Sequence, residues 1–365
     1  MKKVLKIIIL CTSAIIFIMV AIIVRLYMVR GYDYSLQKRH VNELTSYYEK
    51  NHDSLDEGTF LDFDLTDENI RLNDVQYLAT HNSYKKTGPA IGRFFIGLGD
   101  SFEEARALKY GYKNITEQLQ LGIRSFELDL RYRKDTFEIT HVPLVDASSQ
   151  AVNFELLLDE LLLFSNHQEN HMPILVLIEL KNDWMILDPL LKDIDQQALI
   201  KLDDMIKSKL EDKLFLPSNM VDEHTSLKEK IMNDGWPSVS QLTNKFIFIL
   251  HPGAFEQVYY DIDQTLQTQS MFIGSSYGQS YNDYASFFVH NDVDKEIISQ
   301  LISDNFMVRT RIDSNLIFSQ DRFQSAIESG AQILTTDFSI GRSDISLDDV
   351  IYLGDHKLIV KRDSH

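Results

Sequence analysis

The sequence predicts an α/β protein built as a (β/α)8 barrel of the TIM type, preceded by an N-terminal transmembrane helix and a short stalk. From Leu72 onward, short apolar runs alternate with longer amphipathic segments. Strands separated by helices are typical of a parallel sheet. Eight apolar runs in one region of this length favour a barrel over an open sheet. Ionisable residues directly follow several of these runs.

The runs and the helical patterns can be placed along the chain. The predicted strands are Val75–Ala79, Arg124–Leu130, Phe137–Thr140, Ile174–Leu180, Phe246–Leu250, Met271–Ile273, Met307–Arg311 and Ile333–Thr336. Helices are predicted for Gln37–Tyr48, Phe154–Phe164, Gln197–Leu210, Lys295–Ser303 and Asp321–Ser329. The stretch Phe215–Pro237 is polar and irregular, which predicts a long loop or insertion.

Residues 1–30 are expected to anchor the chain in the cell membrane as a single pass. Three lysines precede the uncharged run Ile7–Val24, which is long enough to cross a bilayer as a helix. A cleaved signal peptide is the alternative, but no small-x-small cleavage site lies near Val24. The basic start favours a cytoplasmic N-terminus, so the remainder would lie outside the cell. Cleavage of the segment would make the protein secreted instead.

The composition limits what the rest of the chain does. Residues 31–71 are polar and Tyr-rich, which predicts a stalk, and residues 72–365 are expected to form the barrel domain. With 54 acidic and 36 basic residues, the net charge of −18 disfavours a nucleic-acid partner. The single cysteine, Cys11, excludes an intramolecular disulfide and a cysteine-based metal cluster. We expect a monomer.

One predicted strand carries charged residues on a single face. Along Arg124–Leu130, period-two alternation places Phe126 and Leu128 on one face and Glu127, Asp129 and then Arg131 on the other. Charged side chains at inward positions of a buried strand are costly unless they are paired or bind a cation.

Neighbouring strands also end in ionisable or polar residues. His81 and Asn82 follow the first strand, His141 follows the third, and Glu179 and Lys181 stand at the end of the fourth. The carboxyl ends of barrel strands are where barrel enzymes keep their active sites. Each residue also has a structural interpretation: a histidine bonded to a loop, an asparagine in a turn, or an ion pair.

The donor atoms indicate which cation would fit. Asn82, Glu127, Asp129 and Glu179 all bind through oxygen, which favours Ca²⁺ or Mg²⁺ over zinc. Ca²⁺ fits better, with Mg²⁺ less favoured, because Ca²⁺ accepts several protein oxygens in loose geometry. Two histidines beside such a cation suit phosphodiester cleavage. The basic residues expected to complete an anion-binding surface are Lys181, Arg309 and Arg311.

These motifs resemble phosphoinositide-specific phospholipases C in order and approximate spacing. The matching runs are Leu78–Tyr84, Gln118–Arg124, Phe126–Asp129, Thr140-His141 and Leu177–Leu180. Arg309–Arg311 and Ser329–Asp337 are similar to the calcium-dependent bacterial branch. The resemblance covers about residues 72 to 340, and the first half is the more specific.

The resemblance implies roles for the candidate residues. Asn82, Glu127, Asp129 and Glu179 would hold an active-site Ca²⁺. His81 would stabilise the transition state, His141 would be the general acid toward diacylglycerol, and Glu127 would also be the general base. The nucleophile would be the inositol 2-hydroxyl of a membrane phospholipid such as phosphatidylinositol, which gives a cyclic inositol phosphate.

Two other functions remain as alternatives. The first is a related barrel phosphodiesterase acting on glycerophosphodiesters or lysolipids. Glycerophosphodiester phosphodiesterases share the layout, but there Arg-Gly follows the first histidine, whereas Asn82-Ser83 follows His81 here. The second is a non-catalytic surface protein that binds calcium or a lipid headgroup. Retention of both His81 and His141 disfavours that alternative, because binding requires no general acid.

Overall fold

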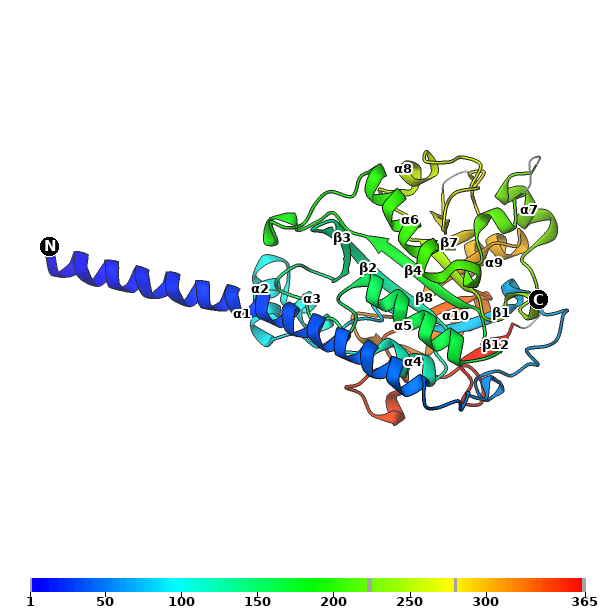
Figure 1. The fold of residues 1–365 in the computed structure, drawn as a ribbon, viewed down its shortest axis with the longest axis horizontal. Coiled ribbons are helices and arrows are strands. Elements are labelled where there is room, and N and C mark those ends of the chain that lie inside the picture. Colours follow the sequence, from blue (N-terminus) through cyan, green and yellow to red (C-terminus); the bar gives the residue numbers. More distant parts are fainter. Residues whose placement is uncertain (1, 222–224, 279–280, 363–365) are drawn as a thin grey trace.

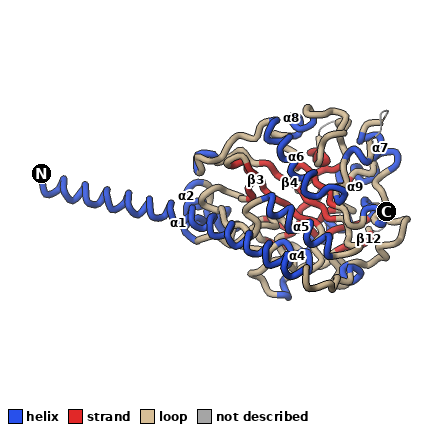
Figure 2. Tube along the Cα trace, viewed as in Figure 1, coloured by secondary structure: helices blue, strands red, loops and turns tan. Residues whose placement is uncertain are grey.

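A sheet of ten strands curls around the core of the described chain, and helices cover its outer side (Figures 1 and 2). The structure is a computed structural model that describes residues 2–221, 225–278 and 281–362. Within these ranges, eight strands run parallel in the spatial order β1-β11-β8-β7-β6-β5-β4-β2. The predicted α/β barrel fold is confirmed.

The parallel strands are β1 Val75–Thr80, β2 Ser125–Arg133, β4 Ile174–Leu180, β5 Phe246–Leu250, β6 Met271–Ser276, β7 Phe287–Val289, β8 Met307–Arg311 and β11 Ile333–Thr336. Two further strands run antiparallel at the ends of the sheet, β3 Thr136–Ile139 on β2 and β12 Ile359–Lys361 on β1. A small hairpin joins β9 Asp313–Ser314 and β10 Ile317–Phe318. The Ser83 amide donates to the Glu127 carbonyl (2.9 Å) where β1 and β2 meet.

Most predicted strands are confirmed, and β4, β5, β8 and β11 have the predicted bounds. The prediction of Phe137–Thr140 as a barrel strand was wrong, because this run folds back on β2 as a hairpin. The parallel strand in its place is β7, whose three residues Phe287–Val289 are too few to show a periodic pattern.

The helices are α1 Lys2–Tyr48, α2 Ala90–Gly99, α3 Phe102–Ala107, α4 Ile115–Gln120, α5 Phe154–His167, α6 Gln196–Leu210, α7 Leu227–Asp234, α8 Glu256–Tyr260, α9 Lys295–Ser303 and α10 Gln320–Ser329. The predicted loop Phe215–Pro237 contains α7, so that prediction was wrong over this part. Ser226 and Glu229 cap each other reciprocally at the start of α7, and Gly235 ends it at φ 69°.

The first helix has two different halves. Its apolar half is exposed and is long enough, by length and composition, to cross a membrane, a test that a signal sequence also passes. Its second half packs against α5, with Leu26, Val41 and Leu44 buried. The helix predicted at Gln37–Tyr48 is the end of this element. The region that we expected to be a stalk therefore lies on the barrel.

The segment between α1 and β1 is also joined to the barrel. Glu57 lies in a short 3-10 helix, Glu57–Phe60, and both its oxygens accept from Arg124 at 2.8 and 2.6 Å. The side chains of Glu57 and Arg124 are buried. Arg124 also donates to the carbonyls of Leu119 and Ile123, so each of its three side-chain nitrogens donates at least one hydrogen bond.

We expect Glu57→Ala to destabilise the fold by about 3–5 kcal/mol, because it leaves the buried Arg124 without its counter-charge. Chemical denaturation followed by circular dichroism measures this loss. Glu43→Ala is the matched control, because Glu43 forms an exposed pair with Arg39 (3.7 Å) whose loss costs about 0–1 kcal/mol. Equal stability of the two variants would contradict a structural role for the Glu57 pair.

Candidate active site

The predicted site residues gather at one end of the barrel, on or directly after β1, β2, β3, β4 and β8. His81 and Asn82 follow β1, Glu127 and Asp129 lie on β2, and His141 follows β3. Glu179 is on β4, in register with Asp129 on the adjacent strand. Lys181 follows β4, and Arg309 and Arg311 lie on β8.

Glu127 lies at the centre of this group. One oxygen accepts from the Arg309 guanidinium, which also contacts Asn291 and donates to Thr335 Oγ1 at 2.9 Å. The other Glu127 oxygen is 3.9 Å from His81 Nε2. Burial would raise the pKa of Glu127, but the charge of Arg309, followed by His81 and His251, lowers it to about 2. Glu127 is therefore a buried, ionised carboxylate.

His81 is oriented by a carboxylate that the sequence did not single out as a site residue. Asp337 follows β11, and its Oδ1 is 3.0 Å from His81 Nδ1. Its other oxygen accepts from Arg311 at 3.2 Å. Although burial opposes the shift, His81 and Arg311 lower the pKa of Asp337. Asp337 closes the late motif of the sequence, so its position after a strand was the available signal.

His141 has a similar partner. Asp146 Oδ2 is 3.3 Å from His141 Nδ1 and also contacts Lys85, which is fully buried. Burial opposes the ionisation of Asp146, but Lys85 and His141 lower its pKa to about 2. Each histidine of the site thus has its own ionised aspartate. Asp146 lies in an irregular segment, where no periodic pattern identifies it.

The remaining carboxylates form the part of the site that could hold a cation. Asp129 is buried, and neither of its oxygens accepts a hydrogen bond from a described residue. Lys181 donates to Glu179 at 2.6 Å, and its Nζ lies 3.7 Å from Asp129. Burial raises the pKa of Asp129. The charge of Lys181 opposes this shift, and the charge of Glu179 adds to it. A bound cation would satisfy these two buried carboxylate oxygens, which otherwise accept no hydrogen bond from the described residues.

Asn82 supplies an amide next to these carboxylates. It is buried and adopts a left-handed backbone conformation (φ 48°), which Asn tolerates better than most residues. Its Nδ2 donates to the Tyr110 hydroxyl at 3.3 Å, which leaves Oδ1 as the available ligand atom. The oxygen-rich donor set fits Ca²⁺, although no three His, Cys, Asp or Glu side chains among the described residues converge as a preformed metal site.

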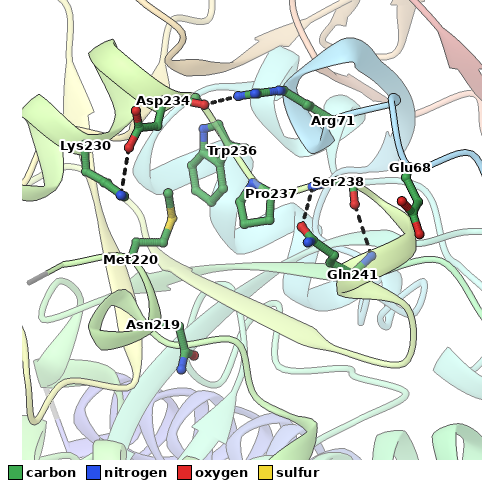
Figure 3. Close-up of a pocket in the computed structure, with 11 residues that line it drawn as sticks. Glu68, Arg71, Asn219, Met220, Lys230, Asp234, Trp236, Pro237, Ser238 and Gln241 are labelled. Carbon is green, nitrogen blue, oxygen red and sulfur yellow. Dashed lines mark hydrogen bonds and ion pairs between the residues drawn. The ribbon is translucent and has the colours of Figure 1, made fainter.

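An apolar cavity of about 270 Å³ adjoins His141 and Lys181. It lies between the α2–α3 pair and the loop after β4, and its apolar walls include Ile96, Val145 and Leu187. A second cavity, of about 360 Å³, is lined by Arg71, Trp236 and Pro237 (Figure 3). Arg71 precedes β1, so this second cavity lies at the opposite end of the barrel and contains none of the predicted site residues.

The fold and the site define a barrel phosphodiesterase. The family model described as phosphoinositide phospholipase C, Ca²⁺-dependent, matches residues 70–135 and 130–361, which is more than half of the chain. The chain therefore belongs to this family of calcium-dependent phospholipases C and is a phosphoric diester hydrolase. No curated protein sequence gives a significant match.

Solved structures agree on the fold. One crystal form of a calcium-dependent phosphoinositol-specific phospholipase C from Pseudomonas sp. is 15% identical, with a TM-score of 0.60, over 84% of this chain and 99% of that chain. The Ca²⁺-dependent phosphatidylinositol-specific phospholipase C of Streptomyces antibioticus is 16% identical, with a TM-score of 0.56, over 73% of this chain and 95% of that chain.

We expect Asp129→Asn to weaken calcium binding without destabilising the calcium-free protein. In chelator, the neutral amide removes a buried, unfavourable charge, so the melting temperature should be unchanged or higher. In calcium, a lost ligand should weaken binding on the order of tenfold or more, measured by calorimetric titration. Asp193→Asn, an exposed carboxylate of the loop after β4, is the control. An unaltered calcium titration of Asp129→Asn would remove Asp129 from the cation site.

Proposed function

We propose that the protein is a phosphatidylinositol-specific phospholipase C that cleaves the bond between phosphate and diacylglycerol. The observation that carries the proposal is the pair of histidines in one barrel mouth, each beside its own ionised aspartate. His81 lies 3.0 Å from Asp337 and His141 lies 3.3 Å from Asp146. Such a pair serves to accept one proton and to donate another.

The reaction begins with attack of the inositol 2-hydroxyl on the phosphorus. The hydroxyl proton passes to a base, for which Glu127 and His81 are the candidates. Glu127 is a weak proton acceptor while Arg309 holds its pKa at about 2. Asp337 supports His81 as the acceptor, because a hydrogen bond from Nδ1–H to Asp337 leaves Nε2 with a lone pair toward the site. If the Arg309 guanidinium moved from Glu127 to bind the substrate phosphate, the pKa of Glu127 would rise and Glu127 would become a better proton acceptor.

The second proton goes to the leaving group. His141, protonated at the start, donates to the diacylglycerol oxygen as the bond to phosphorus breaks, and Asp146 stabilises its charged form. The cavity beside His141 has mainly apolar walls, which suits the glycerol and acyl portion of a lipid. This placement favours a diacylglycerol leaving group over the glycerol of a glycerophosphodiester.

Cations would stabilise the charge that develops on the phosphoryl oxygens. Asn82, Glu127, Asp129 and Glu179 would hold a Ca²⁺ ion, which supplies electrostatic stabilisation when bound. The protein's own contribution comes from Lys181, Arg309 and Arg311, whose donors point into the same group of residues. Anchoring by residues 1–30 would place the enzyme at a membrane surface, outside the cell, where phosphatidylinositol or a related lipid is presented.

Phosphorus NMR of phosphatidylinositol vesicles incubated with the protein tests the reaction. With calcium, a cyclic inositol phosphate signal should appear, and with chelator it should not. A 2-O-methylated substrate should resist cleavage, because it lacks the nucleophile. Cleavage of that analogue, or of glycerophosphodiesters alone, would instead support the related barrel phosphodiesterase. Calcium binding without cleavage of either substrate would support the binding protein.

His141→Ala should lower the rate on phosphatidylinositol on the order of 10²–10⁴-fold if His141 is the general acid. A substrate whose leaving group is p-nitrophenol needs no proton, so the same variant should lose far less activity on it. His52→Ala, an exposed histidine, is the matched control. Equal losses on the two substrates would rule out proton donation as the role of His141.

A further inference from the structure

The second half of α1 is fastened to the barrel along its length. Contacts recur every three or four residues, as expected of one face of a helix. The polar contacts are Arg30 Nε to Glu138 (2.6 Å), Asp33 to Lys86 (2.6 Å), Gln37 Nε2 to the Asn153 carbonyl (2.9 Å) and His40 to Glu160 (3.2 Å). Tyr48 stacks on His167 at a centroid distance of 4.0 Å. This half of α1 therefore cannot swing freely relative to the barrel.

The first half of the same continuous helix extends beyond the barrel (Figure 1). Its uncharged run Ile7–Val24 would span about 27 Å, close to the hydrocarbon thickness of a bilayer. Arg25 follows the run directly, so a bilayer around this segment would end about there. The projecting half lies on the side of α2 and α3, which line the cavity beside His141 (Figure 1).

Exposed apolar side chains gather at the same end of the barrel. Those on α2 and α3 are Phe94, Leu98 and Phe102, with 48%, 62% and 53% of their surface exposed. On the loop after β4, Trp184 is 47% and Ile186 is 91% exposed. We call these five residues the apolar rim. The loop lies directly beside α1, because the Tyr27 hydroxyl donates to the Leu187 carbonyl (3.4 Å), three residues after the apolar run ends.

We propose that α1 is a rigid strut that holds the barrel mouth against the membrane in which the chain is anchored, with the apolar rim at the boundary between the headgroups and the acyl chains. The enzyme then acts on lipids of its own membrane. The partner of the rim is a lipid surface, because the rim continues the apolar surface of the run Ile7–Val24. A net charge of −18 gives no electrostatic attraction to anionic lipids, so α1 supplies the attachment.

The proposal rests on the proposed function and deepens it by naming the source of the substrate. Attachment raises the concentration of substrate at the site, and a fixed orientation presents the cavity beside His141 to the acyl side of the lipid. A flexible tether would supply the first effect but not the second. The contacts of Arg30, Asp33 and Gln37 are what distinguish a strut from a tether.

The fluorescence of the two tryptophans of the chain allows a test that needs neither an attached label nor an activity assay. Trp184 belongs to the apolar rim, whereas Trp236 is buried beside the cavity at the opposite end (Figure 3). The full chain is reconstituted in phosphatidylcholine vesicles with brominated acyl chains, which quench tryptophan on contact. Trp184 should be quenched and Trp236 should not, so Trp184→Phe should abolish the quenching. Unquenched Trp184 in the wild-type chain would overturn the proposal.

Substitutions that remove contacts between α1 and the barrel test whether the helix fixes the orientation. Arg30→Ala with Gln37→Ala should reduce the quenching and should lower cleavage of phosphatidylinositol in the anchoring vesicles on the order of tenfold. Cleavage of a monomeric short-chain phosphatidylinositol should stay unchanged. Arg39→Ala with Glu43→Ala, on the exposed face of the same helix, is the matched control. A loosened chain that keeps the wild-type quenching and rate would overturn the strut.

A comparison of substrate position separates this proposal from the proposed function. Phosphatidylinositol in the anchoring vesicles should be cleaved at least about tenfold faster than the same lipid in separate, protein-free vesicles. Equal rates would refute action on the enzyme's own membrane. Quenching of Trp184 without cleavage of any inositol lipid would refute the proposed function and leave the orientation standing. Cleavage of the monomeric lipid with Trp184 unquenched would refute the proposed orientation and leave the proposed function standing.

Discussion

The ion pair between Glu127 and Arg309 connects opposite parts of the barrel mouth, because β2 and β8 are not neighbours in the sheet. Both side chains are almost completely buried, so removal of either one would leave an uncompensated buried charge. Glu127 lies 3.9 Å from His81, and His81 in turn contacts Asp337, which follows a third strand, β11. The geometry of the site therefore depends on this buried pair.

Charge balance also explains which parts of the site suit a cation. Glu127, Asp146 and Asp337 each contact a basic side chain, and the surroundings lower the pKa of all three. Asp129 differs, because its pKa is raised and neither of its oxygens accepts a hydrogen bond from a described residue. A divalent cation bound beside Asp129 would supply the positive charge that its surroundings lack. The calcium dependence of the family and the physical state of Asp129 thus agree.

The position of α1 connects this chemistry with the origin of the substrate. The helix packs along the barrel wall and leaves it beside the loop that carries Trp184 and Ile186. The cavity next to His141 opens among the same elements. An enzyme that acts on lipids must take its substrate from a surface. The proposed membrane anchor and the apolar rim lie at the same end of the barrel as the proposed active site (Figure 1).

The sequence by itself determined the strands with strong apolar runs, such as Ile174–Leu180, and the candidate residues that follow them. These signals are local, because period-two alternation and strand ends are visible in one stretch of chain. Only the tertiary structure placed Asp146 and Asp337 against the histidines, paired Glu127 with Arg309, and packed α1 on the barrel. Those contacts join segments distant along the chain, and their energies depend on burial and on neighbouring charges, which no local pattern records.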